Sequence, residues 1–150
     1  MATIPDKPFQ NANAATLSPY GSQLLLEDAE TAPTLDGLEV RALCSMSGGS
    51  MAHFVLPMAR VSLPCKHGNF SEIWFVLTGT GKLWRSYESS SAITTLKPGM
   101  SFSLTPHTTF QIQADDQEDL AAIAVTIPAF DPELVTVGKG IWPAGGGDNP

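Results

Sequence analysis

The sequence predicts an all-β protein, a sandwich or barrel of short strands with little helix. A chain of 150 residues is enough for one domain, and its composition, 43% hydrophobic and 15% charged, favours a folded core over disorder. Many short candidate strands follow one another, separated by Gly and Pro turn signals. Only Asp131-Pro132-Glu133 begins like a helix, with Asp as the N-cap and Pro at the first helical position.

The candidate strands follow in order along the chain. They cover residues 23–27, 38–46, 50–56, 72–78, 82–87, 92–96, 101–104, 110–114 and 120–127. Gly48-Gly49 predicts a hairpin between the second and the third of these strands. Gly79-Thr80-Gly81 predicts another between the fourth and the fifth, and Pro98-Gly99 predicts a tight turn before the seventh.

The two ends of the chain lack this pattern. Residues 1–21 are rich in Pro, Asn, Ala and Thr and are expected to form an N-terminal arm, while residues 144–150 are expected to form a flexible tail. One domain is therefore predicted over residues 22–143. Because the sequence shows no apolar signal-peptide core and its two cysteines, Cys44 and Cys65, cannot form a disulfide framework, we expect a reducing, cytoplasmic location.

The charge of the chain argues against two kinds of partner. With 8 basic and 15 acidic residues the net charge is -7, and no cluster of Lys and Arg is present. Nucleic acids and anionic membranes are therefore not expected partners. The most apolar run, residues 120–130, is shorter than the ~20 residues that a membrane-spanning helix needs.

One segment, residues 64–81, carries a more specific pattern. Four residues separate His67 from Glu72, and six residues, Ile-Trp-Phe-Val-Leu-Thr, separate Glu72 from Gly79. This segment resembles the first motif of the cupin superfamily, G-x5-H-x-H-x3-4-E-x6-G, with His67 at the second histidine. Upstream, Leu56-Pro57-Met58-Ala59 resembles the L-P-P-G that usually precedes this motif, without the glycine.

A second motif of the same family, G-x5-P-x-G-x2-H-x3-N, is matched in part. Gly99 opens it, Thr105-Pro106-His107 stands where P-x-G belongs, and Phe110 and Ala114 occupy the closing histidine and asparagine positions. The resemblance is to small single-domain cupins with a degenerate metal motif, and it covers residues 22–143. It implies an antiparallel double-stranded β-helix, the jelly roll or cupin barrel.

The metal site of this family takes two histidines and a glutamate from the first motif and one histidine from the second. Here His67 and Glu72 are kept, whereas Cys65 stands at the first histidine position and Phe110 at the last. Cys65, His67 and Glu72 could hold Zn, Fe, Mn or Ni with an open position. Because Phe110 cannot replace a ligand, we favour no cofactor and expect an empty or partly occupied site.

The resemblance also implies that His67 and Glu72 face the barrel interior, where they could exchange protons with a substrate. They are the predicted catalytic residues, and a purely structural buried pair is the alternative. Strand alternation places Trp74 and Val76 on the side of Glu72 and groups Phe110 with Ile112. The predicted substrate-binding residues are Trp74, Val76, Phe102, Phe110, Ile112 and Arg85.

Three further polar residues carry weaker signals. His53 alternates with Phe54 and is expected to point away from the core. His107 lies beside Pro106 in a turn and is expected to be exposed. Arg85 could bind a carboxylate of a ligand, although a solvated charge on a strand is the simpler interpretation.

The leading functional hypothesis is a small-molecule-binding enzyme of secondary metabolism that performs acid–base chemistry on an apolar metabolite, without a redox cofactor. Isomerisation, cyclisation, dehydration and lyase-type elimination all fit this hypothesis. The alternatives are a metal-dependent cupin of the dioxygenase or zinc type and a non-catalytic binding or sensor module. The N-terminal arm and the apolar strand at residues 120–127, together with the frequent dimerisation of cupins, lead us to expect a homodimer.

Overall fold

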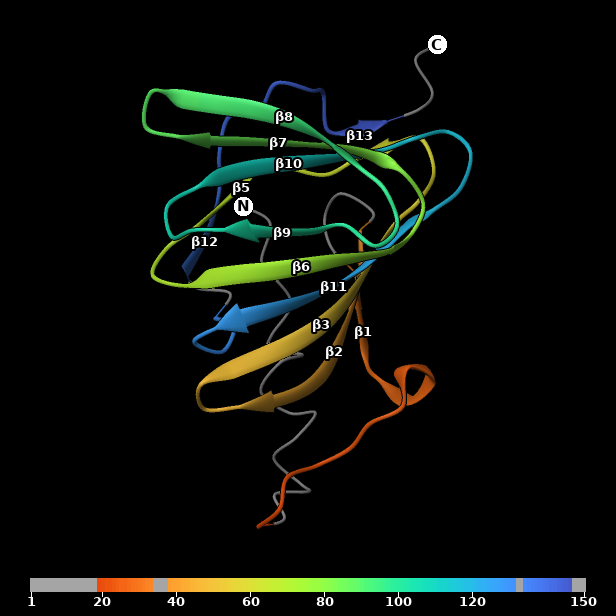
Figure 1. The fold of residues 1–150 in the computed structure, drawn as a ribbon, viewed down its shortest axis with the longest axis vertical. Helices are drawn as coiled ribbons and strands as arrows, with labels where there is room; N and C mark the ends of the chain where they lie inside the picture. Colours follow the sequence, from red (N-terminus) through yellow and green to blue (C-terminus); the bar gives the residue numbers. More distant parts are fainter. Residues whose placement is uncertain (1–18, 34–37, 132–133, 147–150) are drawn as a thin grey trace.

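Two antiparallel β-sheets that share one core make up the fold (Figure 1). The computed structural model describes residues 19–33, 38–131 and 134–146. The first sheet has the strand order β1-β2-β3-β11-β6-β9. The second has the order β12-β5-β10-β4-β13, with β7 paired to β10 and β8 paired to β7. The predicted all-β class with little helix is therefore confirmed.

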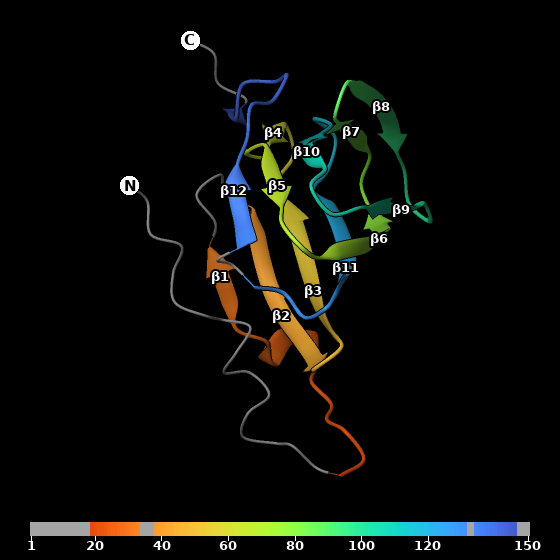
Figure 2. The same ribbon diagram turned by 90° about the vertical axis from the view of Figure 1, so that its left-hand side faces the viewer.

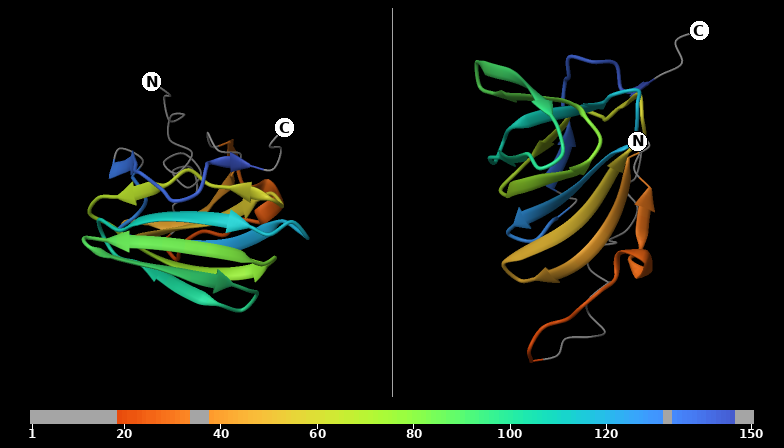
Figure 3. Two further views of the ribbon diagram at one scale, coloured as in Figure 1. Left: turned by 90° about the horizontal axis from the view of Figure 1, so that it is seen from above. Right: turned by 45° about the vertical axis from the view of Figure 1, so that its right-hand side comes forward.

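The strands are short, and most of them pair with at least one strand that is remote in sequence, the exceptions being β1, β2 and β8. The first sheet contains β1 (Thr31–Pro33), β2 (Glu39–Met46), β3 (Gly49–Leu56), β6 (Ser71–Thr78), β9 (Ser101–Leu104) and β11 (Leu120–Ile127). The second contains β4 (Arg60–Val61), β5 (Cys65–His67), β7 (Gly81–Tyr87), β8 (Ser90–Leu96), β10 (Thr109–Ala114), β12 (Val135–Val137) and β13 (Gly145–Gly146). Figure 2 shows β1, β2, β3 and β11 side by side, and the right panel of Figure 3 shows the green strands β7 and β8 above β2, β3 and β11.

Alternating side chains build the core between the two sheets. Along β6 the buried positions are Glu72, Trp74 and Val76, and along β11 they alternate in the same way from Leu120. The main cluster of buried apolar side chains is Leu56, Trp74, Val76, Leu83, Leu96, Phe102, Leu104, Phe110, Ile112, Ala114, Leu120, Ala122 and Ala124. These positions come from both sheets, so the sheets are held together mainly by burial of apolar surface.

The predicted hairpin at Gly79-Thr80-Gly81 is wrong, because β6 pairs with β11 and β9 in the first sheet while β7 pairs with β10 and β8 in the second. The glycines of this connection between the sheets are required by close backbone contacts. Gly79 has a φ of 80°, and a Cβ atom built on it would lie 2.3 Å from the backbone oxygen of Asp119. A Cβ on Gly81 would lie 2.1 Å from the backbone oxygen of Gln113. Any side chain would collide with a neighbouring strand, which explains why this turn needs glycine.

Two elements expected near the ends of the domain differ from the structure or lie beyond it. The predicted strand at residues 23–27 is wrong, because Leu26–Asp28 form a 3-10 turn, η1, closed by the N–H of Asp28 on the carbonyl of Leu25. The predicted helix start at Asp131 continues into residues 132–133, outside the described residues, and the chain then forms strand β12.

The predicted arm and tail fall largely outside the described residues. Residues 1–18 of the arm and 147–150 of the tail lie there. Within the predicted tail, Gly145 pairs with Val61 and Gly146 with Arg60, so the second sheet extends beyond residue 143. In the part of the chain that the structure describes, no helix has the length and apolar character needed to cross a membrane.

Candidate functional site

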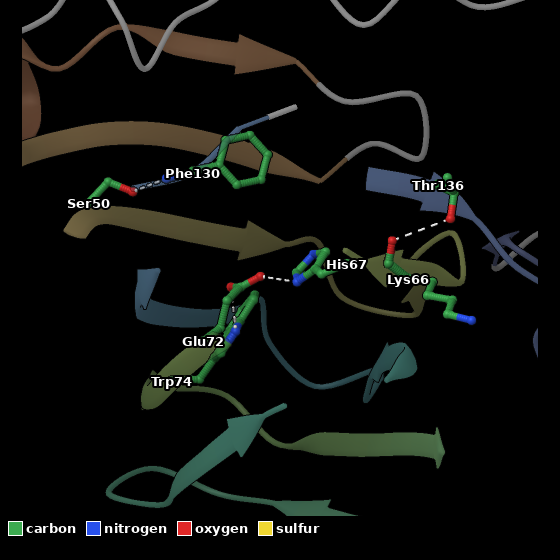
Figure 4. Close-up of polar contacts among 7 residues, drawn as sticks. All are labelled: Ser50, Lys66, His67, Glu72, Trp74, Phe130 and Thr136. Atoms are coloured by element: carbon green, nitrogen blue, oxygen red, sulfur yellow. Dashed lines mark hydrogen bonds and ion pairs between the residues drawn. The ribbon is translucent and has the colours of Figure 1, made fainter. Parts of the chain in front are cut away.

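A buried carboxyl–imidazole pair lies where the two sheets meet. Glu72 is on β6 of the first sheet and His67 is on β5 of the second. The Nδ1 atom of His67 lies 2.6 Å from Oε1 of Glu72, and the two side chains are only 7% and 3% exposed. Figure 4 shows the Glu72 carboxyl pointing at the His67 ring. The structure thus brings the two predicted catalytic residues into direct contact.

The second oxygen of the carboxyl is also engaged. The indole Nε1–H of Trp74, two residues along β6, donates a hydrogen bond of 2.9 Å to Oε2 of Glu72. The polar atoms therefore form a short chain from the Trp74 indole through the Glu72 carboxyl to the His67 ring.

Aromatic rings surround this chain of polar groups. The His67 ring lies 4.4 Å from that of Phe70 and 5.1 Å from that of Phe110, measured between ring centroids. The Phe70 ring in turn contacts Phe130, whose backbone N–H donates to Oγ of Ser50 at 2.8 Å. Such an apolar shell removes water from both members of the pair and penalises their charged forms.

The protonation of the pair follows from this burial. Burial raises the pKa of Glu72 to about 8, and the hydrogen bond from Trp74 opposes this rise in part. Burial lowers the pKa of His67 to about 4. Near pH 7 both groups are therefore neutral, the carboxyl O–H donates to Nδ1, and His67 keeps its own proton on Nε2. The contact is a hydrogen bond between neutral groups rather than an ion pair.

The metal ligands expected from the motif do not form a set. Cys65 and His67 are both partly or fully buried on β5, with the exposed Lys66 between them. A metal bound by His67 and Glu72 would need each donor atom about 2.0–2.2 Å from the ion, whereas Nδ1 and Oε1 bind each other directly. Among the described residues, no group of three or more His, Cys, Asp or Glu side chains could hold a metal ion. The residues as arranged do not fit a metal.

A small apolar pocket lies on the other side of Trp74. Its lining is Leu38, Phe54, Leu56, Trp74, Val76, Leu96, Phe102, Ile112, Leu120 and Ala122. Its cavity volume is about 10 Å³, the room of roughly one water molecule and far below the ~300–1,000 Å³ of ligand pockets, so a ligand must displace side chains to enter it. The Trp74 indole stacks on Phe102 at 5.5 Å and packs on Phe54 at 4.5 Å.

The predicted pocket residues divide between these two places. Trp74, Val76, Phe102 and Ile112 line the apolar pocket, whereas Phe110 packs against the His67 ring instead. Arg85 donates to the backbone oxygen of Ser103 at 3.1 Å and to Oγ1 of Thr94 at 3.2 Å, away from the pocket lining. The expectation of one cavity holding both the apolar wall and the carboxyl is therefore corrected, because the Trp74 indole stands between the two.

The remaining histidines lie outside this site. His53 is half-buried on β3, opposite Arg41 and Ile123, and burial together with the Arg41 charge lowers its pKa. His107 is exposed in the turn before β10, and its backbone N–H donates to the carbonyl of His67 at 2.9 Å. Neither side chain contributes to the buried pair.

Two parts of the site were not found by sequence reasoning. Phe70, which is almost fully buried against His67, precedes β6 and belongs to no alternating run. Phe54, Leu56, Leu120 and Ala122 close the pocket from β3 and β11. Alternation along these two strands could have identified them as inward-facing.

Comparison with known proteins shows similarity of fold and no similarity of sequence to a known family. No protein-family model and no curated protein matches the sequence. Among solved structures, KdgF from Halomonas sp. matches with a TM-score of 0.65 at 19% identity over 76% of this chain and 99% of that chain. Oxalate decarboxylase from Bacillus subtilis matches with a TM-score of 0.69 at 13% identity, over 78% of this chain and 32% of that chain. A Klebsiella pneumoniae protein with a double-stranded β-helix domain matches with a TM-score of 0.62 at 11% identity, over 78% and 96%.

Proposed function

We propose that this chain, which has the double-stranded β-helix fold of the cupin proteins, binds an apolar small molecule in its barrel and exchanges a proton with it through Glu72 and His67. The observation that carries the proposal is the 2.6 Å contact between a carboxyl and an imidazole in aromatic surroundings. Perturbed titratable groups of this kind gather at catalytic sites more often than elsewhere. Enzymes such as oxalate decarboxylase also occur among the structural neighbours.

The neutral pair can deliver one proton without creating a buried cation. A ligand that displaces the Trp74 indole, which stands between the pocket and the pair, can reach the imidazole. His67 then gives the proton on Nε2 to the substrate, and the carboxyl O–H of Glu72 passes its proton to Nδ1. The imidazole remains neutral, with its proton moved from one nitrogen to the other, and one negative charge forms on Glu72 as its carboxyl becomes a carboxylate. The same two proton transfers in the reverse direction remove a proton from the substrate. Isomerisation, cyclisation, dehydration and lyase-type elimination each need such a donor and acceptor.

Trp74 links the binding of a ligand to this proton transfer. Its ring is part of the pocket wall, while its Nε1–H donates to Oε2 of Glu72. This hydrogen bond opposes the rise in the pKa of Glu72. A ligand ring that shifts the indole weakens the bond. The loss of the bond raises that pKa further and favours the proton-donating form of the pair.

A second function is favoured by the pocket itself. All of its lining residues are apolar, and the Trp74 indole separates it from Glu72. A binding or sensor module that never uses the carboxyl would have the same pocket. For the first function, the enzyme, we propose a place in secondary metabolism, since the apolar pocket suits an apolar substrate.

Two probes distinguish the two functions. Indole binding, followed by amide chemical shifts of Val76 and Ile112, tests the pocket. Proton abstraction from 5-nitrobenzisoxazole, an apolar ring with one acidic C–H, tests Glu72 as a base. We expect indole to bind, and we expect the reporter rate to rise as the pH passes about 8, where Glu72 ionises.

Matched variants make the outcome specific. Glu72→Gln keeps the shape of the side chain and is expected to lower the reporter rate about 10²–10⁴-fold while leaving indole binding intact. Glu39→Gln, an exposed carboxyl on β2, is expected to leave both unchanged. Indole binding with an equal reporter rate in wild type and Glu72→Gln would instead establish a binding module.

A further inference from the structure

The inner face of the first sheet carries a stack of three aromatic rings. The indole of Trp74 lies 5.5 Å from the ring of Phe102, with 16° between the planes, and 4.5 Å from the ring of Phe54, with 31° between the planes. Trp74 is on β6, Phe102 on β9 and Phe54 on β3. Because β9 and β3 lie on opposite sides of β6 in the sheet, the indole is the middle ring of the stack.

Small side chains on β11 make this stack possible. β11 lies between β3 and β6, where Ala122 pairs with Phe54 and Ala124 pairs with Trp74. Both alanines are buried. Since a methyl group leaves the space above its strand open, the large rings of the two neighbouring strands can meet there. The sheet thus forms a flat-walled site for one ring, bounded by Phe54 and Phe102, which we call the ring slot.

The indole fills the ring slot almost completely. Trp74 is only 3% exposed, and the cavity beside it measures about 10 Å³. An apolar cavity that takes up a single benzene ring needs about 150 Å³. A ligand ring therefore has no room in the pocket while the indole stays in place, and the space that a ligand could use is the space of the indole itself.

The contacts that hold the indole are ones that a ligand ring could replace. One hydrogen bond, from Nε1 to Oε2 of Glu72 at 2.9 Å, fixes its polar edge (Figure 4). A single hydrogen bond between neutral groups adds little net stability. The contacts with Phe54 and Phe102 are stacking and apolar burial, which an aromatic ligand in the same place restores. Leu38 and Phe54 in the pocket wall are half-buried, so the indole can turn towards this side as it leaves the slot.

We propose that Trp74 occupies the ligand site of the barrel as a stand-in, and that the ligand is a flat bicyclic aromatic molecule of about the size of an indole. The ligand takes the middle place between Phe54 and Phe102, and the departing indole uncovers Oε2 of Glu72. This inference rests on the proposed function, since it names the class of apolar molecule that the barrel binds. A saturated molecule with the same skeleton is puckered and cannot stack on both rings.

A matched pair of probes tests the class of ligand. 2-Naphthol and decahydro-2-naphthol share one carbon skeleton and one hydroxyl group, but the first is flat and the second is puckered. We expect the wild type to bind 2-naphthol at least about tenfold more tightly, because only the flat ring stacks on both walls of the slot. The indole N–H signal of Trp74 in a proton–nitrogen correlation spectrum, assigned by its loss in Trp74→Phe, is expected to move to the position of a solvent-exposed indole as 2-naphthol binds.

Two variants test the role of the indole as a competitor. Trp74→Ala removes the ring that closes the slot and is expected to bind 2-naphthol at least about tenfold more tightly than the wild type, because no protein molecule then has its site occupied. Trp142→Ala removes another indole, from the C-terminal segment beside the second sheet, and is expected to leave the affinity unchanged. An unchanged circular dichroism spectrum verifies that each variant folds.

Several outcomes would overturn the inference. It is wrong if the wild type does not bind 2-naphthol, if it binds both alcohols equally, or if 2-naphthol binds without moving the Trp74 signal. It is also wrong if folded Trp74→Ala binds 2-naphthol no more tightly than the wild type does. If Trp74→Ala does not fold, the signal of Trp74 in the wild type decides. The proposed enzyme fails on a different measurement, an equal rate of proton abstraction from 5-nitrobenzisoxazole in wild type and Glu72→Gln.

Discussion

At the scale of single residues, the Glu72–His67 pair couples stability to pH. In the folded chain the pKa of Glu72 is raised from 4.5 to about 8, so its proton is kept over a range in which the unfolded chain has lost it. This contribution to stability is fully present below pH 4.5 and is lost as the pH rises through about 8. The pKa of His67 is lowered from 6.5 to about 4, so its contribution is present above pH 6.5 and is lost as the pH falls towards 4.

The two contributions predict a plateau followed by a decline. Between pH 4.5 and 6.5 the opposite slopes of the two groups cancel, and from pH 6.5 to about 8 only the slope of Glu72 remains. We expect the free energy of unfolding to fall by about 1.4 kcal/mol per pH unit in that upper window. Urea denaturation at pH 6.5, 7 and 8 measures it. Glu72→Gln should remove the decline, Glu39→Gln should keep it, and an equal slope in all three proteins would contradict the assignment.

A second residue-scale prediction concerns Ala59. It adopts a φ of 62°, the left-handed region, at the position where the family resemblance implies a glycine. This conformation costs a non-glycine residue roughly 1–2 kcal/mol, while glycine loses roughly 0.5–1 kcal/mol more entropy on folding. Ala59→Gly is therefore expected to stabilise the chain by about 0.5–1 kcal/mol, seen as a higher urea midpoint. Ala92→Gly, in the extended strand β8, should lower the midpoint, and a lower midpoint for Ala59→Gly as well would refute the strain.

At the scale of elements, Gln111 on the second sheet holds the C-terminal segment through side-chain hydrogen bonds. Its side chain on β10 is fully buried. The amide nitrogen donates to the backbone oxygens of Ser62 at 3.0 Å and Trp142 at 2.7 Å. The amide oxygen accepts from the backbone N–H groups of Ile141 and Trp142, both at 3.1 Å. One side chain thus satisfies four backbone groups that belong to two separate segments.

Removal of these hydrogen bonds should release the C-terminal segment. Gln111→Met keeps most of the side-chain volume but leaves four backbone groups without this partner, at a cost of about 2–4 kcal/mol. Thermal unfolding measures the loss, and limited proteolysis should cut after residue 138 first. Gln113→Met, two residues along the same strand and half-exposed, is expected to change stability by less than about 0.5 kcal/mol. Equal effects of the two substitutions would show that Gln111 has no special role.

At the scale of the whole molecule, the apolar pocket between the sheets connects ligand binding to stability. A ligand that binds only the folded chain stabilises it by about 2.7 kcal/mol at a hundred times its dissociation constant. Indole is expected to raise the melting temperature of the wild type accordingly. Ala122→Leu, which adds volume to the pocket wall, should abolish this rise, while Ala92→Leu on the exposed strand β8 should preserve it. If indole still raises the melting temperature of Ala122→Leu, the ligand binds at another site.

Local sequence features were sufficient for much of the fold. Alternation marked β2, β3, β6 and β11, and Gly48-Gly49 marked the hairpin between β2 and β3, whereas Gly79 and Gly81 marked a connection between the sheets and no hairpin. These signals are readable because each strand must place every second side chain in the core, and because a turn with a close backbone contact excludes a Cβ atom. The strands β1, β4, β5, β12 and β13 have two or three residues each and were missed, since so few residues show no period.

By itself, the sequence determined the all-β class and the β2–β3 hairpin, because alternation and turn residues are properties of neighbouring positions. The resemblance of residues 64–81 to the cupin motif pointed to Glu72 and His67. Only the tertiary structure decided that Trp74 separates this pair from the pocket, that Gln111 holds the C-terminal segment and that β6 and β11 expose an apolar face. Each of these depends on segments that are remote in sequence but adjacent in space. The protonation of the pair has the same origin, because the rings of Phe70 and Phe110 that surround His67 belong to separate segments of the chain.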